Sequence, residues 1–331
     1  MRYLLAALAL TLLLPGAAAA QSLGGTLGEP TPTFSLSVTP AYPAPYSKAT
    51  LSLLSSSLDL AGGTASISID GKNIYKGAVQ PIAVQLGRAG SITRVSATVS
   101  IGIENYTQTL SIQPQDVALV IEPVSSAPAL YPGKPLVPLE GSARIVAVAN
   151  LRTAGGAPIA PTALSYAWTV DGTQIANSSG IGKTAIMVAS PLQYRGRTVS
   201  VAVKSVDGTL VGGASLLLSA ADPSVRVYEN DPLLGIRFDR ALSGGFSVGN
   251  TESTLYAAAF SLPTTQGAPL LQWFLNGTAA QTGSSITLRP TGSGQGSASL
   301  SLVASAGQYA RATATLPLTF GAKPSTNLFG L

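Results

Sequence analysis

The most regular hydrophobic pattern in the chain lies between residues 164 and 172. Every second position is apolar and the positions between are small or polar; the apolar set is Leu164, Tyr166, Trp168 and Val170. A period of two predicts a strand with one buried face. Asp171-Gly172 follows at once, and both residue types accept the positive φ of a tight turn. The stretch therefore predicts one arm of a β-hairpin.

This strand and turn recur on both sides. Downstream, Trp273 is followed by Asn276-Gly277, and upstream, in a weaker copy, Ile67 is followed by Asp70-Gly71. The three turns lie about 100 residues apart, which is the length of one immunoglobulin-type β-sandwich. Each repeat is long enough to enclose a core of its own. We therefore expect three sandwich domains in tandem.

Alternating strands flank each copy in the same order, and no amphipathic helical stretch of convincing length follows the N-terminal region. The pattern predicts an all-β fold of antiparallel sandwiches and argues against βαβ units. The predicted divisions of the chain are a signal peptide at 1–20, a flexible leader at 21–33, sandwiches at 34–116, 117–222 and 223–321, and a C-terminal tail at 322–331.

The N-terminus has the pattern of a secretory signal. Arg2 supplies a positive charge, residues 4–14 form an apolar run, and residues 17–20 are small, as in a cleavage region. The apolar run is too short to span a bilayer comfortably, which takes about 20 residues. We expect cleavage before Gln21 and export to the periplasm, the cell surface or the extracellular space, with no membrane span in the mature chain. Retention as an N-terminal anchor is the alternative.

Composition narrows the function classes. Charged residues make up 10% of the chain, against about 25% in an average domain. The net charge of +5 includes no run of Lys or Arg, so a nucleic-acid partner is not expected. Histidine and cysteine are both absent, which removes the usual general base of serine and cysteine hydrolases, thiolate metal ligands and disulfides. We expect no catalytic residues and no enzyme activity; a hydrolase that uses paired carboxylates is the remaining alternative.

The aromatic residues have two interpretations. Trp168 and Trp273 share a face with apolar neighbours, which predicts a structural core that includes Tyr166 and Ile67. The alternative for the tryptophans is a platform for sugar stacking. A carbohydrate- or cell-wall-binding module would need exposed aromatics on one face. The candidates in predicted loops or edges are Tyr42, Tyr46, Tyr131 and Tyr309.

The densest run of charge joins the second and third repeats. Its carboxylates lie among three arginines, and the acidic residues are Asp222, Glu229, Asp231 and Asp239. Oxygen ligands suit Ca²⁺, so calcium at this joint is the one cofactor hypothesis. The interleaved arginines favour surface ion pairs instead, and the expectation is no cofactor.

Two stretches of the second repeat carry a family resemblance: Tyr166-Ala-Trp168-Thr-Val-Asp171-Gly172 and Gly196-Arg-Thr-Val199-Ser-Val201-Ala-Val203. With a core tryptophan, a D/N-G hairpin and a later G-x-x-V-x-V-x-V strand, the chain resembles the PKD and Ig-like β-sandwich modules of bacterial exported multidomain proteins. The third repeat keeps Trp273 and Asn276-Gly277, and the first has Ile67 in place of tryptophan. The resemblance implies a sandwich fold and a role as spacer, adhesion element or binding platform.

Together these observations predict an exported, non-enzymatic protein of three tandem Ig-like or PKD-like sandwiches. We expect it to act outside the cytoplasm as a spacer, an adhesion element or an assembly module of the cell surface, a class that includes accessories of pili and secretion machines. Its partner would be a protein or a cell-surface polymer. A carbohydrate- or cell-wall-binding module is the competing hypothesis.

Overall fold

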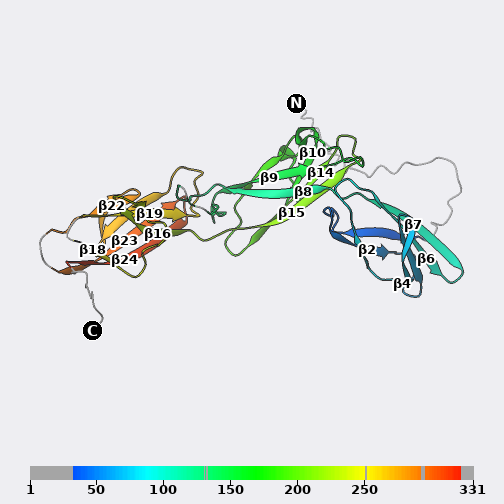
Figure 1. Cartoon of the computed structure of the whole chain (residues 1–331), viewed down its shortest axis with the longest axis horizontal. Helices are drawn as coiled ribbons and strands as arrows, with labels where there is room; N and C mark the ends of the chain where they lie inside the picture. Colours follow the sequence, from blue (N-terminus) through cyan, green and yellow to red (C-terminus); the bar gives the residue numbers. More distant parts are fainter. Residues whose placement is uncertain (1–32, 130, 132, 250–251, 292–294, 322–331) are drawn as a thin grey trace, which may run out of the picture.

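The computed structural model describes residues 33–129, 131, 133–249, 252–291 and 295–321. These residues form mainly β-strands, and Figure 1 shows three β domains that follow one another in chain order along the longest axis. The predicted signal peptide, the leader up to residue 32 and the C-terminal tail lie outside the described residues. Within the described part, no helix is long and apolar enough to cross a membrane.

The first sandwich packs a three-stranded sheet, in the order β1-β2-β5, against a four-stranded sheet, in the order β4-β3-β6-β7. Its strands are β1 (Ser35–Thr39), β2 (Lys48–Leu54), β3 (Thr64–Ile69), β4 (Lys72–Ala78), β5 (Ile82–Gln85), β6 (Thr93–Ile101) and β7 (Glu104–Ile112). All of these neighbours pair antiparallel. The inner faces share one core, in which Leu51, Ile67 and Val99 are fully buried.

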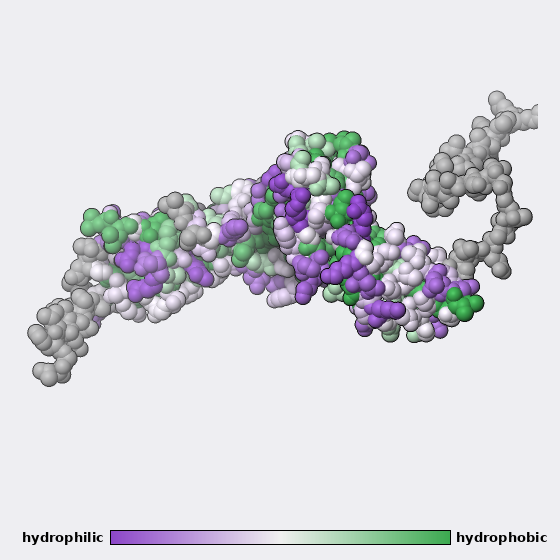
Figure 2. All heavy atoms as spheres, turned by 45° about the vertical axis from the view of Figure 1, so that its right-hand side comes forward, coloured by the Kyte–Doolittle hydropathy of each residue, from purple (hydrophilic) through white to green (hydrophobic). Residues whose placement is uncertain are grey.

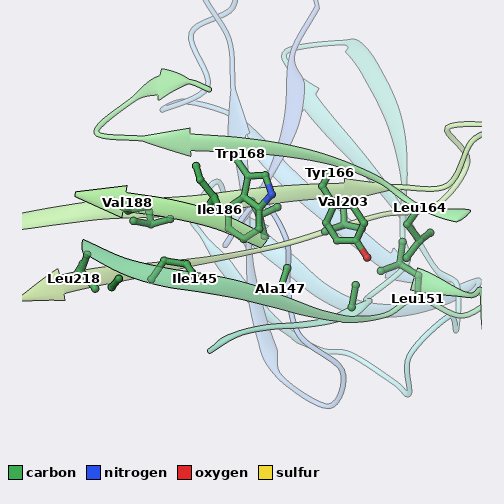
Figure 3. Packing of buried hydrophobic residues seen from close by; sticks show 14 of the residues in the cluster. Ile145, Ala147, Leu151, Leu164, Tyr166, Trp168, Ile186, Val188, Val203 and Leu218 are labelled. Atoms are coloured by element: carbon green, nitrogen blue, oxygen red, sulfur yellow. The ribbon is translucent and has the colours of Figure 1, made fainter. Parts of the chain in front are cut away.

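The second sandwich packs the sheet β13-β9-β8 against the sheet β11-β10-β14-β15, with β12 also paired to β10. Its elements are β8 (Asp116–Pro123), β9 (Ser142–Asn150), the 3-10 turn η1 (Pro161–Ala163), β10 (Ser165–Val170), β11 (Thr173–Gln174), the 3-10 turn η2 (Ala176–Ser178), β12 (Gly180–Ile181), β13 (Ala185–Ala189), β14 (Gly196–Lys204) and β15 (Val211–Ser219). Figure 3 shows Trp168 and Tyr166 of β10 pointing between the sheets, toward Ile145 and Ala147 of β9.

The third sandwich has the sheets β17-β16-β19-β22 and β18-β24-β23-β20-β21. Its strands are β16 (Ser224–Asp231), β17 (Gly235–Ile236), β18 (Phe246–Val248), β19 (Ser253–Phe260), β20 (Leu270–Leu275), β21 (Thr278–Thr282), β22 (Ser285–Leu288), β23 (Gly296–Ala306) and β24 (Ala310–Phe320). β18 pairs with β24 in parallel, a departure from the predicted antiparallel pairing, because β18 follows a long connection rather than a hairpin. The all-β fold of tandem sandwiches is confirmed.

The predicted turn is the same in all three domains. Asp70, Asp171 and Asn276 have φ values of 48°, 50° and 49°, and each is followed by a glycine with positive φ. The side-chain oxygen of each also accepts a hydrogen bond from a backbone N–H of the neighbouring strand. The donors are Arg94 at 3.0 Å, Thr198 at 2.9 Å and Ser299 at 2.8 Å. The turn residue therefore shapes the hairpin and also fixes it to the next strand of its sheet.

Candidate functional site

The residues predicted to form the structural core are buried. Four side chains are buried in the three cores: Ile67, Tyr166, Trp168 and Trp273. Each indole N–H donates to a backbone carbonyl, Trp168 Nε1 to Lys183 at 2.8 Å and Trp273 Nε1 to Gly283 at 2.9 Å. Because both indoles are fully buried, neither presents a face on which a sugar could stack.

The acidic calcium candidates are spread along the start of the third sandwich. Asp239 forms an ion pair with Arg237 at 3.1 Å, and this guanidinium lowers the pKa of Asp239. Asp231 accepts hydrogen bonds from two backbone N–H groups of its own turn, which lower its pKa. Asp222 accepts from a glutamine amide at 3.2 Å, and Glu229 lies on β16. Among the described residues, no three acidic, His or Cys side chains are grouped so that they could hold a metal ion.

The joint between the second and third sandwiches is held by backbone hydrogen bonds. The N–H of Ser126 donates to the carbonyl of Leu262 at 2.8 Å, and the N–H of Ser261 donates to the carbonyl of Ser126 at 3.1 Å. The N–H of Thr264 donates to the carbonyl of Val124 at 3.2 Å. The segment after β8 therefore pairs, in the manner of a short strand, with the loop between β19 and β20.

Glu140 adds a second set of bonds at the same joint. Its carboxylate accepts hydrogen bonds from three consecutive backbone N–H groups in the β23–β24 turn, those of Gln308 (3.0 Å), Tyr309 (2.9 Å) and Ala310 (3.2 Å). These bonds, with that from Gln308 foremost, lower the pKa of Glu140. Gly307 leaves room for the carboxylate, because a Cβ at this position would lie 2.8 Å from the carboxyl carbon.

The joint between the first and second sandwiches is also closely packed. The N–H of Gly90 donates to the linker carbonyl of Pro114 at 2.9 Å, and Gln113 Nε2 returns a bond to the carbonyl of Gly90 at 2.9 Å. On the other side, Gln115 exchanges two bonds with the backbone of Arg152, at 2.8 and 3.0 Å. Gly90 lies so close to the second sandwich that a Cβ there would be 2.4 Å from the carbonyl oxygen of Thr153.

The candidate tyrosines are divided between the joints: Tyr42 and Tyr46 at the first, Tyr131 and Tyr309 at the second. The ring of Tyr42 lies over Gly213 of the second sandwich, where a Cβ would be 2.4 Å from Tyr42 Cδ2. Tyr131 packs edge-to-face on Phe260 of the third, with ring centroids 5.2 Å apart. The four tyrosines therefore do not share one binding face. Tyr42 and Tyr131 pack against the neighbouring domain at the joints.

A groove of 540 Å³ opens beside the first joint. Its polar lining comes from both sandwiches: Tyr46 and Arg88 from the first, and Asp116, Asn150 and Arg152 from the second. The volume lies within the range of about 300 to 1,000 Å³ that is usual for small-ligand sites. Its volume and its polar lining from two domains make this groove a candidate binding site.

The sequence patterns did not identify the residues that form the joints and the groove. Glu140 and its first partner, Gln308, are 168 residues apart, and no local pattern links them. Arg88 and Arg152 were not singled out either, because each is an isolated arginine in its own repeat. The Asp-Gly and Asn-Gly pairs and the alternating valines predict turns and strands, but not which loops meet at a joint.

No family model matches the chain, and no curated protein does. Solved multidomain structures do match. One is the three N-terminal domains of the bacteriophage RB49 highly immunogenic outer capsid protein, 12% identical over 88% of this chain and 99% of that one, with a TM-score of 0.24. Another is the central fibronectin-III array of RIM-binding protein, 10% identical over 89% and 97%, with a TM-score of 0.27.

A third is the Bacteroides ovatus mixed-linkage glucan utilization protein SGBP-B in complex with a mixed-linkage heptasaccharide. It is 12% identical over 90% of this chain and 77% of that one, with a TM-score of 0.22. The matched structures include immunoglobulin and fibronectin-III arrays. At these scores the likeness carries no conclusion about function.

Proposed function

We propose that this protein is an exported, non-enzymatic structural module that holds three β-sandwiches in a fixed succession, as a spacer and adhesion or assembly element of the cell surface. The observation that supports it is the bonding at both joints. Domains joined in one chain move relative to each other by default unless their interface is extensive. Here, backbone hydrogen bonds join the second and third sandwiches, and the linker bonds to both the first and the second.

The linkers between the sandwiches are also short. Residues 113–115 separate β7 from β8, and residues 220–223 separate β15 from β16. Linkers of this length leave little freedom to the domains that they join. A fixed succession of sandwiches suits a protein that must present a surface at a set distance and orientation.

The side chains suit a structural role rather than catalysis. The sequence has no histidine or cysteine, and the described residues contain no cluster of three acidic side chains that could hold a metal ion. On the face seen in Figure 2, hydrophilic residues (purple) and hydrophobic residues (green) are interspersed over the sandwiches. We further propose that the sandwiches are PKD-like, on the pattern of Trp168 and Asp171-Gly172.

Small-angle X-ray scattering tests the fixed arrangement on the chain from Gln21 onward. We expect a single elongated particle whose maximum dimension does not spread with temperature below unfolding. Gly90→Ala should broaden the distribution, because its Cβ would collide with Thr153 O. Gly71→Ala is the matched control, since Gly71 has nearly the same φ (82° against 80°) but open space around its Cβ position. A wild-type protein as flexible as Gly90→Ala would contradict the proposal.

Export is tested by fractionating cells that produce the full chain and sequencing the N-terminus of the recovered protein. We expect a mature N-terminus at Gln21, outside the cytoplasm. An intact Met1 on a cytosolic protein would contradict export. One observation, the groove beside the first joint, favours a second function, the binding of a cell-surface polymer.

A further inference from the structure

Two arginines from different sandwiches, Arg88 and Arg152, line the groove beside the first joint and approach the same glycine. Arg88 Nη1, from the first sandwich, lies 2.7 Å from the position that a Cβ on Gly156 would occupy. Arg152 Nη1, from the second sandwich, donates to the carbonyl of the same Gly156 at 3.0 Å. Two positive side chains from different domains therefore reach one glycine.

Neither Arg88 nor Arg152 forms an ion pair within the described residues. The ion pairs formed there use other arginines, and neither Arg88 nor Arg152 has a carboxylate oxygen within 4.0 Å. Within the described residues, each guanidinium donates one hydrogen bond to the protein. Arg88 Nη2 donates to the carbonyl of Ala154 at 3.4 Å, and Arg152 Nη1 donates to the carbonyl of Gly156. An arginine has five N–H donors in a planar fork that matches a carboxylate. The remaining donors are available to an anion.

Tyr46 forms the aromatic wall of the groove. Its φ of 57° is a left-handed conformation that is uncommon for tyrosine. The backbone is held there on both sides, since its N–H donates to Gly87 O at 2.9 Å and its carbonyl accepts from Gln85 Nε2 at 2.7 Å. The residue is nevertheless 71% exposed. A strained, fixed backbone that presents an exposed ring is typical of a residue with a binding role.

Asp116 and Asn150 supply acceptors beside the arginines. They are directly opposite each other where β8 pairs with β9, and both line the groove. The carboxylate of Asp116 and the amide oxygen of Asn150 can both accept hydrogen bonds from hydroxyl groups. The groove therefore combines guanidinium groups that can donate hydrogen bonds to an anion, oxygens that can accept hydrogen bonds from hydroxyl groups, and an aromatic ring.

We propose that this groove binds an acidic carbohydrate, a sugar unit that carries a carboxylate within a cell-surface polymer. Arg88 and Arg152 bind the carboxylate, Tyr46 stacks on the apolar face of the sugar ring, and Asp116 and Asn150 accept bonds from its hydroxyls. The inference names the ligand class for the second function proposed above, binding of a cell-surface polymer, and rests on it; it does not depend on the spacer function. Because the arginines come from two domains, binding also stabilises the first joint.

Isothermal titration of the chain from Gln21 onward with trigalacturonate tests the proposal, with the neutral trisaccharide maltotriose as the uncharged control. We expect binding of the carboxylated sugar alone, weakened by salt. Arg88→Gln should weaken it about tenfold, the scale of one charged hydrogen-bonding partner. Arg94→Gln, which removes the same charge from the exposed face of β6, should leave it unchanged.

The ring is tested with a second pair of variants. Tyr46→Phe should bind as the wild type does, whereas Tyr46→Asn should bind several-fold more weakly, because asparagine accepts the positive φ but has no ring. Melting curves of all four variants confirm that they fold. Undetectable binding of trigalacturonate overturns the proposal, as does equal binding by Arg88→Gln and the wild type. Comparable binding of maltotriose, tri-L-glutamate or inorganic phosphate overturns it too, because the ligand would then not be an acidic sugar.

Discussion

The carboxylate of Glu140, in the second sandwich, accepts a hydrogen bond at 2.9 Å from the backbone N–H of Tyr309, in the third. Two neighbouring N–H groups of the same turn, those of Gln308 and Ala310, also donate to it. One side chain thereby fixes a hairpin of one domain against the next. The orientation of the third sandwich depends on the charge of this carboxylate, because three N–H donors prefer an ionised acceptor.

The first prediction concerns the pH dependence of this joint. The pKa of Glu140 is lowered in the folded chain by the three N–H donors, so the contact stabilises the joint above the pKa of an unfolded glutamate, about 4.3. That stabilisation is lost as the pH falls through the lower, folded value. We expect scattering to show a more flexible second joint once the pH has fallen below this lowered value, and Glu140→Gln to show a weakened joint at neutral pH. A Glu140→Gln protein that is as rigid at pH 7 as the wild type would contradict this role.

The second prediction separates backbone strain from the contact with Glu140. Gly307 and Gly102 are the first turn residues of the β23–β24 and β6–β7 hairpins, and their φ values are 62° and 61°. A Cβ on Gly307 would lie 2.8 Å from the Glu140 carboxyl group, whereas around Gly102 the space is open. Substitution by alanine should cost about 1 to 2 kcal/mol at either site because of the positive φ. Only Gly307→Ala should also loosen the second joint in scattering. Equal scattering from both variants would argue against the role of the Glu140 contact at this joint.

The strands and turns were predictable because their causes are local. The alternation around Trp168 and the conformational freedom of Asp171-Gly172 are properties of neighbouring residues, and the hairpin formed as predicted. The joints were not predictable from such patterns, because contacts such as Glu140 with Gln308 depend on how completed domains meet. The groove was hidden for the same reason: Arg88 and Arg152 acquire a common environment only once two sandwiches are placed side by side.

The third prediction concerns the repeated turn residue. The Asp171 carboxylate accepts from the N–H of Thr198 at 2.9 Å, and an asparagine amide does the same at position 276. Asp171→Asn should therefore cost less than about 1 kcal/mol, including its exposed ion pair with Arg197. Asp171→Ala loses both the acceptor and a side chain that tolerates positive φ, so we expect a loss of about 1 to 3 kcal/mol. Denaturant unfolding followed by tryptophan fluorescence measures both, and equal losses would contradict the double role of this residue.

The fourth prediction concerns the core of the second sandwich. Trp168 is fully buried, so Trp168→Ala should lower the free energy of unfolding of its domain by about 3 to 5 kcal/mol. Trp168→Phe keeps a ring but leaves the carbonyl of Lys183 without the indole N–H, which should cost about 1 to 3 kcal/mol. The chain has two tryptophans, so the fluorescence of either variant reports the third sandwich through Trp273. We expect the unfolding of the third sandwich, followed by Trp273 fluorescence, to change little. A melting curve in which the second sandwich is as stable as in the wild type would contradict the core assignment of Trp168.

The last prediction is that Ca²⁺ leaves the second joint unchanged. The Asp239 carboxylate is bound by the guanidinium of Arg237 through both oxygens, at 3.1 and 3.2 Å, and Asp231 accepts from two N–H groups of its turn. A calcium ion would have to displace these partners and draw together carboxylates that the fold keeps apart, whereas calcium sites normally present six to eight oxygens. Calorimetric titration with Ca²⁺ should therefore give no binding heat and no change in melting temperature. A saturable heat that disappears in Asp231→Asn would instead show that the charged run binds calcium after a rearrangement.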